Sequence, residues 1–177
     1  MMDEKCLIGL DLGTSAIKGV LMSAKGVVIA KEKARTSYIT AQDGSIEFDA
    51  EEFYSLVAGV IQNLVKALPD GAVVAGLSMV TASGNTVLLD GADKPLMNAV
   101  SWMDTRARDE AQTVFGELLN PAEIHQMTGW PFINMFPIVH LSWLKCHQPG
   151  MLQQAAKICM STDYVNFRLT GEWGIDS

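Results

Sequence analysis

The chain begins with two apolar runs separated by a short polar segment, and no other feature constrains its fold as strongly. The first run covers residues 6–10 and leads into Asp11, and the second begins at Ala16. A glycine and two hydroxyl residues lie between them. Short apolar runs bounded by Gly and small polar residues are typical of β-strands joined by a turn. The segment therefore predicts a strand, a tight polar turn and a returning strand.

The same turn carries the groups that a nucleotide phosphate needs. Asp11 can hold Mg²⁺ directly or through water, and Gly13 has no side chain to keep the backbone away from an anion. Thr14 and Ser15 offer O–H and N–H donors, while Lys18 supplies a positive charge. The spacing matches neither the P-loop nor the Rossmann fingerprint, and an ordinary β-hairpin could use these residues as well. The segment is similar to the first phosphate motif of the actin-like, sugar-kinase and Hsp70-like ATPase superfamily.

Length and composition predict one globular domain and argue against several classes of protein. The 177 residues, 49% of them apolar, fit a single domain with a sizeable core. A net charge of −7 argues against nucleic-acid or membrane-surface partners, which need clustered Lys and Arg. No apolar run approaches a membrane span, and the N-terminus does not resemble a signal peptide. Three cysteines without a Cys-x-x-Cys pattern are typical of a reduced cytoplasmic protein.

Periodicity along the rest of the chain predicts an α/β order of elements. A third strand over 27–38 would complete an antiparallel meander. Asp49 has the character of a helix N-cap, with Glu52 in capping-box position and apolar residues at helical spacing up to Leu68. The apolar run 72–80 predicts a buried, parallel strand. Shorter strands are expected at 86–89 and 99–102, and helices at 105–119, 121–128, 137–147 and 161–170.

Two further polar clusters could bind a ligand. The first follows the expected parallel strand, where α/β folds place ligands, and consists of Thr81, Ala82, Ser83, Gly84 and Asn85. In the second, Trp102 offers a flat apolar face to a sugar, Asp104 accepts hydrogen bonds from hydroxyls, and Arg106 can fix Asp104 or a ligand oxygen. The first cluster is also compatible with a plain connecting loop. The second is compatible with a helix N-terminus that Asp104 caps.

Together, four segments resemble the N-terminal part of the FGGY family of carbohydrate kinases. They lie in the expected order along the chain, at 9–18, 76–90, 101–106 and 161–172. The resemblance implies an α/β, ribonuclease-H-like fold of the actin-like ATPase superfamily over residues 1–177. Such a domain has a mixed sheet with an antiparallel three-strand meander and flanking helices. Family members are much longer, so the resemblance places the ATP-binding C-terminal domain and the catalytic-base aspartate beyond Ser177.

The family implies an activity for the full-length protein, ATP-dependent phosphorylation of a sugar hydroxyl, while the isolated fragment would be inactive. The resemblance makes D-xylulose or a related ketose the expected substrate, with gluconate or another polyol as the alternative. Asp11 would be catalytic and would hold Mg²⁺ through water, and the phosphates of ATP would bind Gly13, Thr14, Ser15 and Lys18. The sugar would contact Thr81, Ala82, Ser83, Gly84, Trp102, Asp104 and Arg106. The implied partners are the sugar, ATP and the C-terminal domain of the same chain.

Two departures from the family pattern bear on the substrate. His140 stands where the family's helix carries a lysine. The sugar loop of close xylulokinases carries Met-His, whereas this chain has Ser83-Gly84 or Thr81-Ala82 there, depending on the alignment. The missing histidine counts against D-xylulose, and the absence of the glycerol kinases' Arg-Glu pair counts against glycerol. The three histidines do not share metal-ligand spacing, so packing or surface roles are expected for them.

A function of another class shares the phosphate motif. An ATP-driven conformational switch of the actin or Hsp70 kind would need the same turn but no sugar pocket. The missing second domain also has a consequence for association. Its absence would expose an apolar face, from which self-association into a homodimer is expected.

Overall fold

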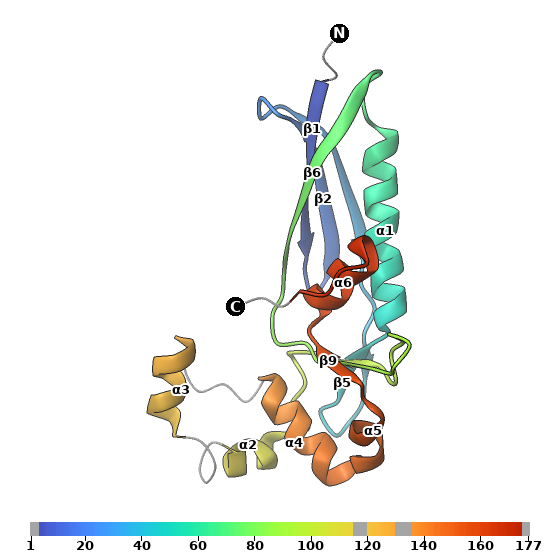
Figure 1. Cartoon of the computed structure of the whole chain (residues 1–177). Coiled ribbons are helices and arrows are strands. Elements are labelled where there is room, and N and C mark those ends of the chain that lie inside the picture. Colours follow the sequence, from blue (N-terminus) through green and yellow to red (C-terminus); the bar gives the residue numbers. More distant parts are fainter. Residues whose placement is uncertain (1–3, 115–119, 130–135, 175–177) are drawn as a thin grey trace. The chain divides into compact units, whose positions relative to one another are not determined.

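The computed structural model describes residues 4–114, 120–129 and 136–174 (Figure 1). Cα packing divides the chain into two compact units. The first unit contains Met1–Ser37 and Glu51–Ala82, and the second contains Tyr38–Ala50 and Ser83–Ser177. Each unit has β-structure of its own.

A four-stranded mixed sheet forms the first unit, with strand order β3-β2-β1-β6. β1 (Glu4–Leu12) pairs antiparallel with β2 (Ala16–Ser23), which pairs antiparallel with β3 (Val28–Arg35). β6 (Ala72–Thr81) runs parallel to β1. The expected meander and the parallel direction of β6 are thereby confirmed.

One face of this sheet packs on α1 (Ala50–Lys66), which begins directly after Asp49 as the capping pattern predicts (Figure 1). Alternate residues of β1 are buried, namely Cys6, Ile8, Leu10 and Leu12. The helix comes close to the sheet at Gly19 of β2, where a Cβ atom would lie 2.7 Å from both Val60 and Leu64 of α1. Only glycine therefore lets the helix lie this close to the sheet.

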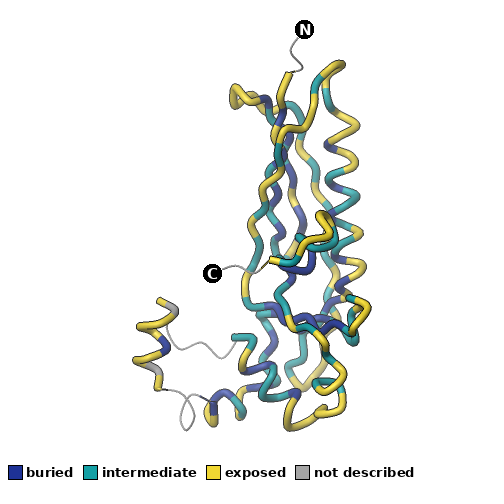
Figure 2. Tube along the Cα trace, viewed as in Figure 1, coloured by how far each residue is buried: buried dark blue, intermediate teal, exposed yellow. Residues whose placement is uncertain are grey.

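The edge strand β6 is exposed, so the prediction of a buried strand at 72–80 is wrong. Four of its apolar residues are 36–66% exposed, namely Val73, Val74, Leu77 and Val80. Figure 2 accordingly colours β6 as intermediate or exposed. A continuous apolar run is typical of strands covered on both faces and flanked on both edges. Among the described strands, however, β6 pairs with β1 alone. The strand therefore carries more apolar surface than its neighbours in this unit cover.

The second unit combines short strands with most of the helices. β4 (Ile39–Thr40), β5 (Ile46–Phe48) and β8 (Ala99–Val100) form one antiparallel sheet, and β7 (Val87–Leu89) pairs with β9 (Lys157–Cys159) in another. The helices are α2 (Arg108–Thr113), α3 (Pro121–Thr128), α4 (Pro137–His147), α5 (Pro149–Gln154) and α6 (Ser161–Thr170). Apolar residues of α2, α3 and α4 share a buried cluster that includes Ala111, Ile124 and Val139.

Most helices of this unit lie where the spacing of apolar residues in the sequence predicts them. The expected helices at 121–128, 137–147 and 161–170 are confirmed. The helix expected at 105–119 begins three residues later, at Arg108, and residues 115–119 lie outside the described part of the chain. The elements β4, β5, β9 and α5 were not predicted, because they are short and do not form apolar runs. No helix in the described ranges has both the length and the hydropathy to cross a lipid bilayer.

Candidate functional site

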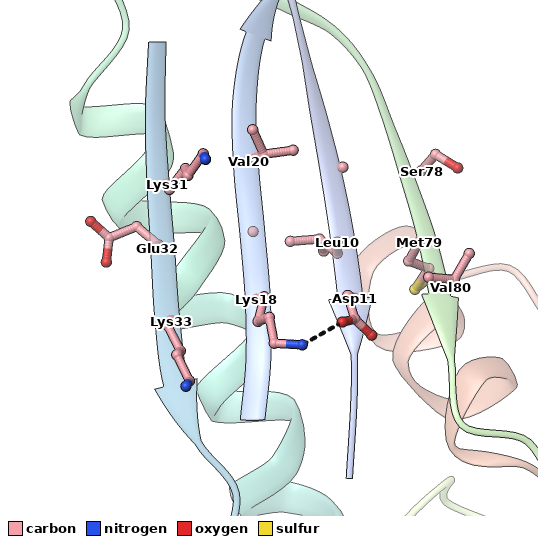
Figure 3. A pocket seen from close by; sticks show the side chains of 12 residues that line it. Leu10, Asp11, Lys18, Val20, Lys31, Glu32, Lys33, Ser78, Met79 and Val80 are labelled. Atoms are coloured by element: carbon pink, nitrogen blue, oxygen red, sulfur yellow. Dashed lines mark hydrogen bonds and ion pairs between the residues drawn. The ribbon is translucent and has the colours of Figure 1, made fainter. Parts of the chain in front are cut away.

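The predicted phosphate turn lies at the end of the β1–β2 hairpin. Asp11 and Lys18 are directly opposite each other in the antiparallel register, and Lys18 Nζ lies 2.9 Å from Asp11 Oδ2 (Figure 3). The two side chains are 48% and 58% exposed, respectively. An ion pair in such contact with water contributes little to stability. Both charged groups can therefore exchange their partner for a ligand at small cost.

Gly13 lies close to its neighbours inside this turn. A Cβ atom at this position would lie 3.1 Å from the carbonyl oxygen of Ala16 and 3.5 Å from Asp11 Oδ1. The Ala16 carbonyl would have to shift slightly to admit a side chain, whereas the distance to the Asp11 carboxylate is an ordinary contact. Thr14 is half-buried and Ser15 is exposed beside it. The structure thus brings the five residues expected at the phosphates into one hairpin end.

An open pocket extends from this turn over the face of the sheet opposite α1 (Figure 3). Lys31 and Lys33 of β3 line it beside Lys18, and its carboxylates are those of Asp11 and Glu32. Val80 of β6 forms part of the opposite wall. Three lysines against two carboxylates leave this pocket of a net acidic chain with a small excess of positive charge. The charge distribution favours an anionic ligand.

The loop expected to contact the sugar is divided between the two units. Thr81 and Ala82 belong to the first unit, where the N–H of Ala82 donates to the carbonyl oxygen of Leu12 over 3.3 Å. Ser83 and Gly84 belong to the second unit. Gly84 has φ +89°, a conformation that residues with a side chain rarely adopt. A residue with a side chain at position 84 would therefore be strained in this backbone.

In the second candidate cluster, Asp104 is a fully buried hydrogen-bond acceptor. Its carboxylate accepts from the backbone N–H groups of Ile46 (2.7 Å) and Arg106 (2.9 Å) and from the Arg106 guanidinium (2.7 Å). It does not cap a helix, because α2 begins only at Arg108, with Ala107 as its N-cap. The alternative of Asp104 as an N-cap is therefore wrong. The carboxylate holds the turn at residues 101–106 against β5.

Arg106 connects Asp104 to a residue that the sequence pattern did not single out. Its Nη2 lies 2.7 Å from Glu47 Oε1, and its guanidinium lies 5.0 Å from the ring centre of Trp143. The Arg106 side chain is 7% exposed. Burial alone would lower the pKa of Arg106, but the hydrogen bonds to Asp104 and Glu47 outweigh this and raise it. The guanidinium is therefore a fixed positive charge.

His140 lies in the interior of the second unit, in agreement with the expected packing role. It is 2% exposed, and its Nδ1 lies 2.8 Å from Oγ1 of Thr86, which is also buried. No described residue hydrogen-bonds to its Nε2. Burial lowers the pKa of His140 to about 4. The ring is therefore neutral near pH 7.

Comparison with known proteins identifies the family. The model of the N-terminal domain of the FGGY family of carbohydrate kinases matches residues 6–177. The chain belongs to this family. The relatives also carry the expected fold class, a mixed α/β domain of the actin-like ATPase type.

Three relatives illustrate the similarity. The chain is 28% identical to a gluconokinase of Bacillus subtilis, over 96% of this chain and 33% of the relative. It is 31% identical to a xylulose kinase of Bacillus subtilis, over 94% and 33%. The crystal structure of gluconate kinase from Lactobacillus acidophilus superimposes with a TM-score of 0.88 at 29% identity, covering 96% of this chain and 34% of that one. The chain thus spans about a third of the length of the curated relatives it matches.

The FGGY domain contains one polar residue bonded to this cluster that sequence reasoning did not assign to the site. Glu47, the partner of Arg106, lies in a three-residue strand, where nothing in the pattern marks it. Asn85 is the last residue of the expected sugar loop, and its side chain accepts a hydrogen bond from the N–H of Trp102. Within the described residues, no group of three or more His, Cys, Asp or Glu side chains is placed to hold a metal ion.

Proposed function

We propose that the full-length protein transfers the terminal phosphoryl group of ATP to a hydroxyl of a sugar. The observation that carries this proposal is the β1–β2 hairpin end, where Asp11, Gly13 and Lys18 lie together in a member of the FGGY family. The proposed acceptor is D-xylulose or a related ketose, and gluconate or another polyol is the second candidate. Relatives named as xylulose kinase and as gluconokinase support these two candidates.

On the phosphate side, Mg²⁺ would be held by Asp11 through water. Mg²⁺ in kinases keeps several waters and uses one or two carboxylates together with substrate phosphates, so one half-exposed carboxylate fits it. When bound, the ion neutralises charge on the phosphates. The backbone N–H groups and hydroxyls of Thr14 and Ser15 would bind phosphate oxygens. Lys18 would leave its ion pair with Asp11 for a phosphate oxygen, at little cost because the pair is exposed.

On the sugar side, the half-buried Trp102 would pack its indole face against the C–H surface of the sugar. Ser83 and Gly84 would offer hydroxyl and backbone groups, and Thr81 and Ala82 remain predicted contacts. The Asp104 carboxylate has no exposed surface and is already bonded. We therefore assign Asp104 the task of holding Arg106, whose fixed guanidinium would orient a ligand oxygen.

An ATP-driven conformational switch remains the competing function, because it would use the same hairpin end without a sugar. The two differ in what stimulates ADP formation. Coupled ADP release by the full-length protein with Mg·ATP should be measured over a panel of ketoses, polyols and aldonates. A strong response to one of these compounds would support the kinase and name its substrate. ADP release that no compound changes would favour the switch.

A further inference from the structure

Asn85 joins three segments of the second unit that are distant in sequence. Its side chain is 4% exposed, and both ends of its carboxamide are hydrogen-bonded. Oδ1 accepts from the backbone N–H of Trp102 over 2.9 Å. Nδ2 donates over 3.0 Å to Oγ of Ser161, the first residue of α6. One side chain therefore ties the loop at residues 83–85 both to the turn of Trp102 and to the start of α6.

The two partners determine which way round the carboxamide lies. A backbone N–H can only donate, so it must face the oxygen of Asn85. The NH₂ group then faces the hydroxyl of Ser161, which can accept and is itself 2% exposed. A buried polar group is costly unless it is bonded, so these two bonds select one arrangement of the three segments.

The turn of Trp102 is anchored independently on its other side. The Ser101 hydroxyl accepts from the N–H of Met103 (3.2 Å), and the Ser101 carbonyl accepts from the N–H of Asp104 (3.0 Å). The Asp104 carboxylate in turn accepts from the N–H of Ile46 in β5. Asn85 supplies the opposite anchor, at the N–H of Trp102 itself.

We propose that Asn85 is a positioning residue for sugar binding. It sets the place of the Trp102 indole through the backbone of the turn and does not touch the reacting atoms. The proposal rests on the proposed function, since it requires the sugar to pack against Trp102. A displaced indole would pack less well against the sugar and so weaken its binding. Asn85 therefore acts on sugar affinity and leaves nucleotide binding unchanged.

The test compares variants of the full-length protein by KM for the most active sugar, KM for ATP and Tm. Asn85→Ala removes both bonds and is expected to raise the sugar KM about tenfold or more, with the ATP KM unchanged within about twofold. Asn85→Asp keeps oxygen acceptors for Trp102 and for the Ser161 hydroxyl but buries a charge. It should lower Tm while the sugar KM stays within about threefold of wild type. The control is Asn166→Ala, which removes another carboxamide of the second unit. Asn166 lies in α6, the helix that begins with Ser161, and this variant should match wild type in both KM values.

The pattern of the three variants decides the proposal. An unchanged sugar KM in Asn85→Ala would overturn it. A sugar KM that follows Tm in all variants, including Asn85→Asp, would also overturn it, because that is the mark of a purely structural role. If Asn85→Ala does not fold, Ser161→Ala removes one bond alone and should raise the sugar KM about fivefold or more. A wild-type protein without sugar-dependent ADP release would overturn the proposed function as well, whereas the other outcomes leave that function standing.

Discussion

At the scale of single residues, Asp11 tests the proposed chemistry most directly. Asp11→Ala in the full-length protein should lower the rate of sugar phosphorylation at least about 100-fold, because the charge that holds Mg²⁺ at the phosphates is lost. Folding should change little, since the ion pair with Lys18 is exposed. Coupled ADP release and Tm measure the two effects. Asp70→Asn, an exposed carboxylate after α1, is the matched control. A near-wild-type rate for Asp11→Ala would remove Asp11 from the mechanism.

His140 makes a second prediction at this scale, on stability against pH. Burial lowers its pKa from 6.5 to about 4 in the folded protein, so the unfolded chain binds the proton more readily. The stability from a neutral His140 is complete above pH 6.5 and is lost as the pH falls toward 4. Between pH 7.5 and 5 this amounts to about 2 kcal/mol of unfolding free energy.

Urea unfolding at both pH values measures this loss. His140→Gln, which keeps a polar partner for Thr86 without a titrating ring, should lose about 2 kcal/mol less than wild type over the same interval. Equal losses in the two proteins would show that other groups determine the acid sensitivity.

At the scale of elements, the packing of α1 on the sheet depends on a glycine contact. Gly19→Ala would bring a Cβ atom within 2.7 Å of Val60 and Leu64. The expected cost is about 1–3 kcal/mol of unfolding free energy, because helix and strand must move apart. Gly59→Ala in α1 is the matched control, since a Cβ atom there meets nothing within 4 Å. It should stabilise the helix by about 0.5–1 kcal/mol. Chemical denaturation measures the free energy of unfolding of both variants. Changes of the same sign in the two variants would contradict this packing.

At the scale of the whole molecule, the exposed strand β6 predicts self-association of this chain. Its ten residues carry no charge, and a flat, uncharged edge strand pairs readily with another chain. Sedimentation velocity of the 177-residue chain should therefore show dimers or larger species.

A lysine on the edge strand should prevent this pairing. Val80→Lys is expected to shift the chain toward monomer, because Val80 is 66% exposed on β6. Val27→Lys is the matched control, at 63% exposure in the turn between β2 and β3. If both variants associate as the wild type does, β6 is not the contact surface.

The sequence alone determined most elements and the composition of the phosphate turn. The hairpin, α1 and three later helices follow from apolar spacing and turn residues, which act within a few positions of the chain. Asp11 and Lys18 become neighbours because a three-residue turn sets the register of the hairpin. The order of the four motifs along the chain was sufficient to indicate the family.

Only the tertiary structure decided what those elements bury and which polar groups meet. The apolar run of β6 predicts burial, but burial depends on neighbours that the strand lacks in its unit. Asp104 meets Ile46 across 58 positions, and Asn85 meets Ser161 across 76. Contacts over such separations depend on how whole segments pack, and local spacing carries no information about them. The contacts that hold Trp102 and Arg106 in place were therefore visible only in the fold.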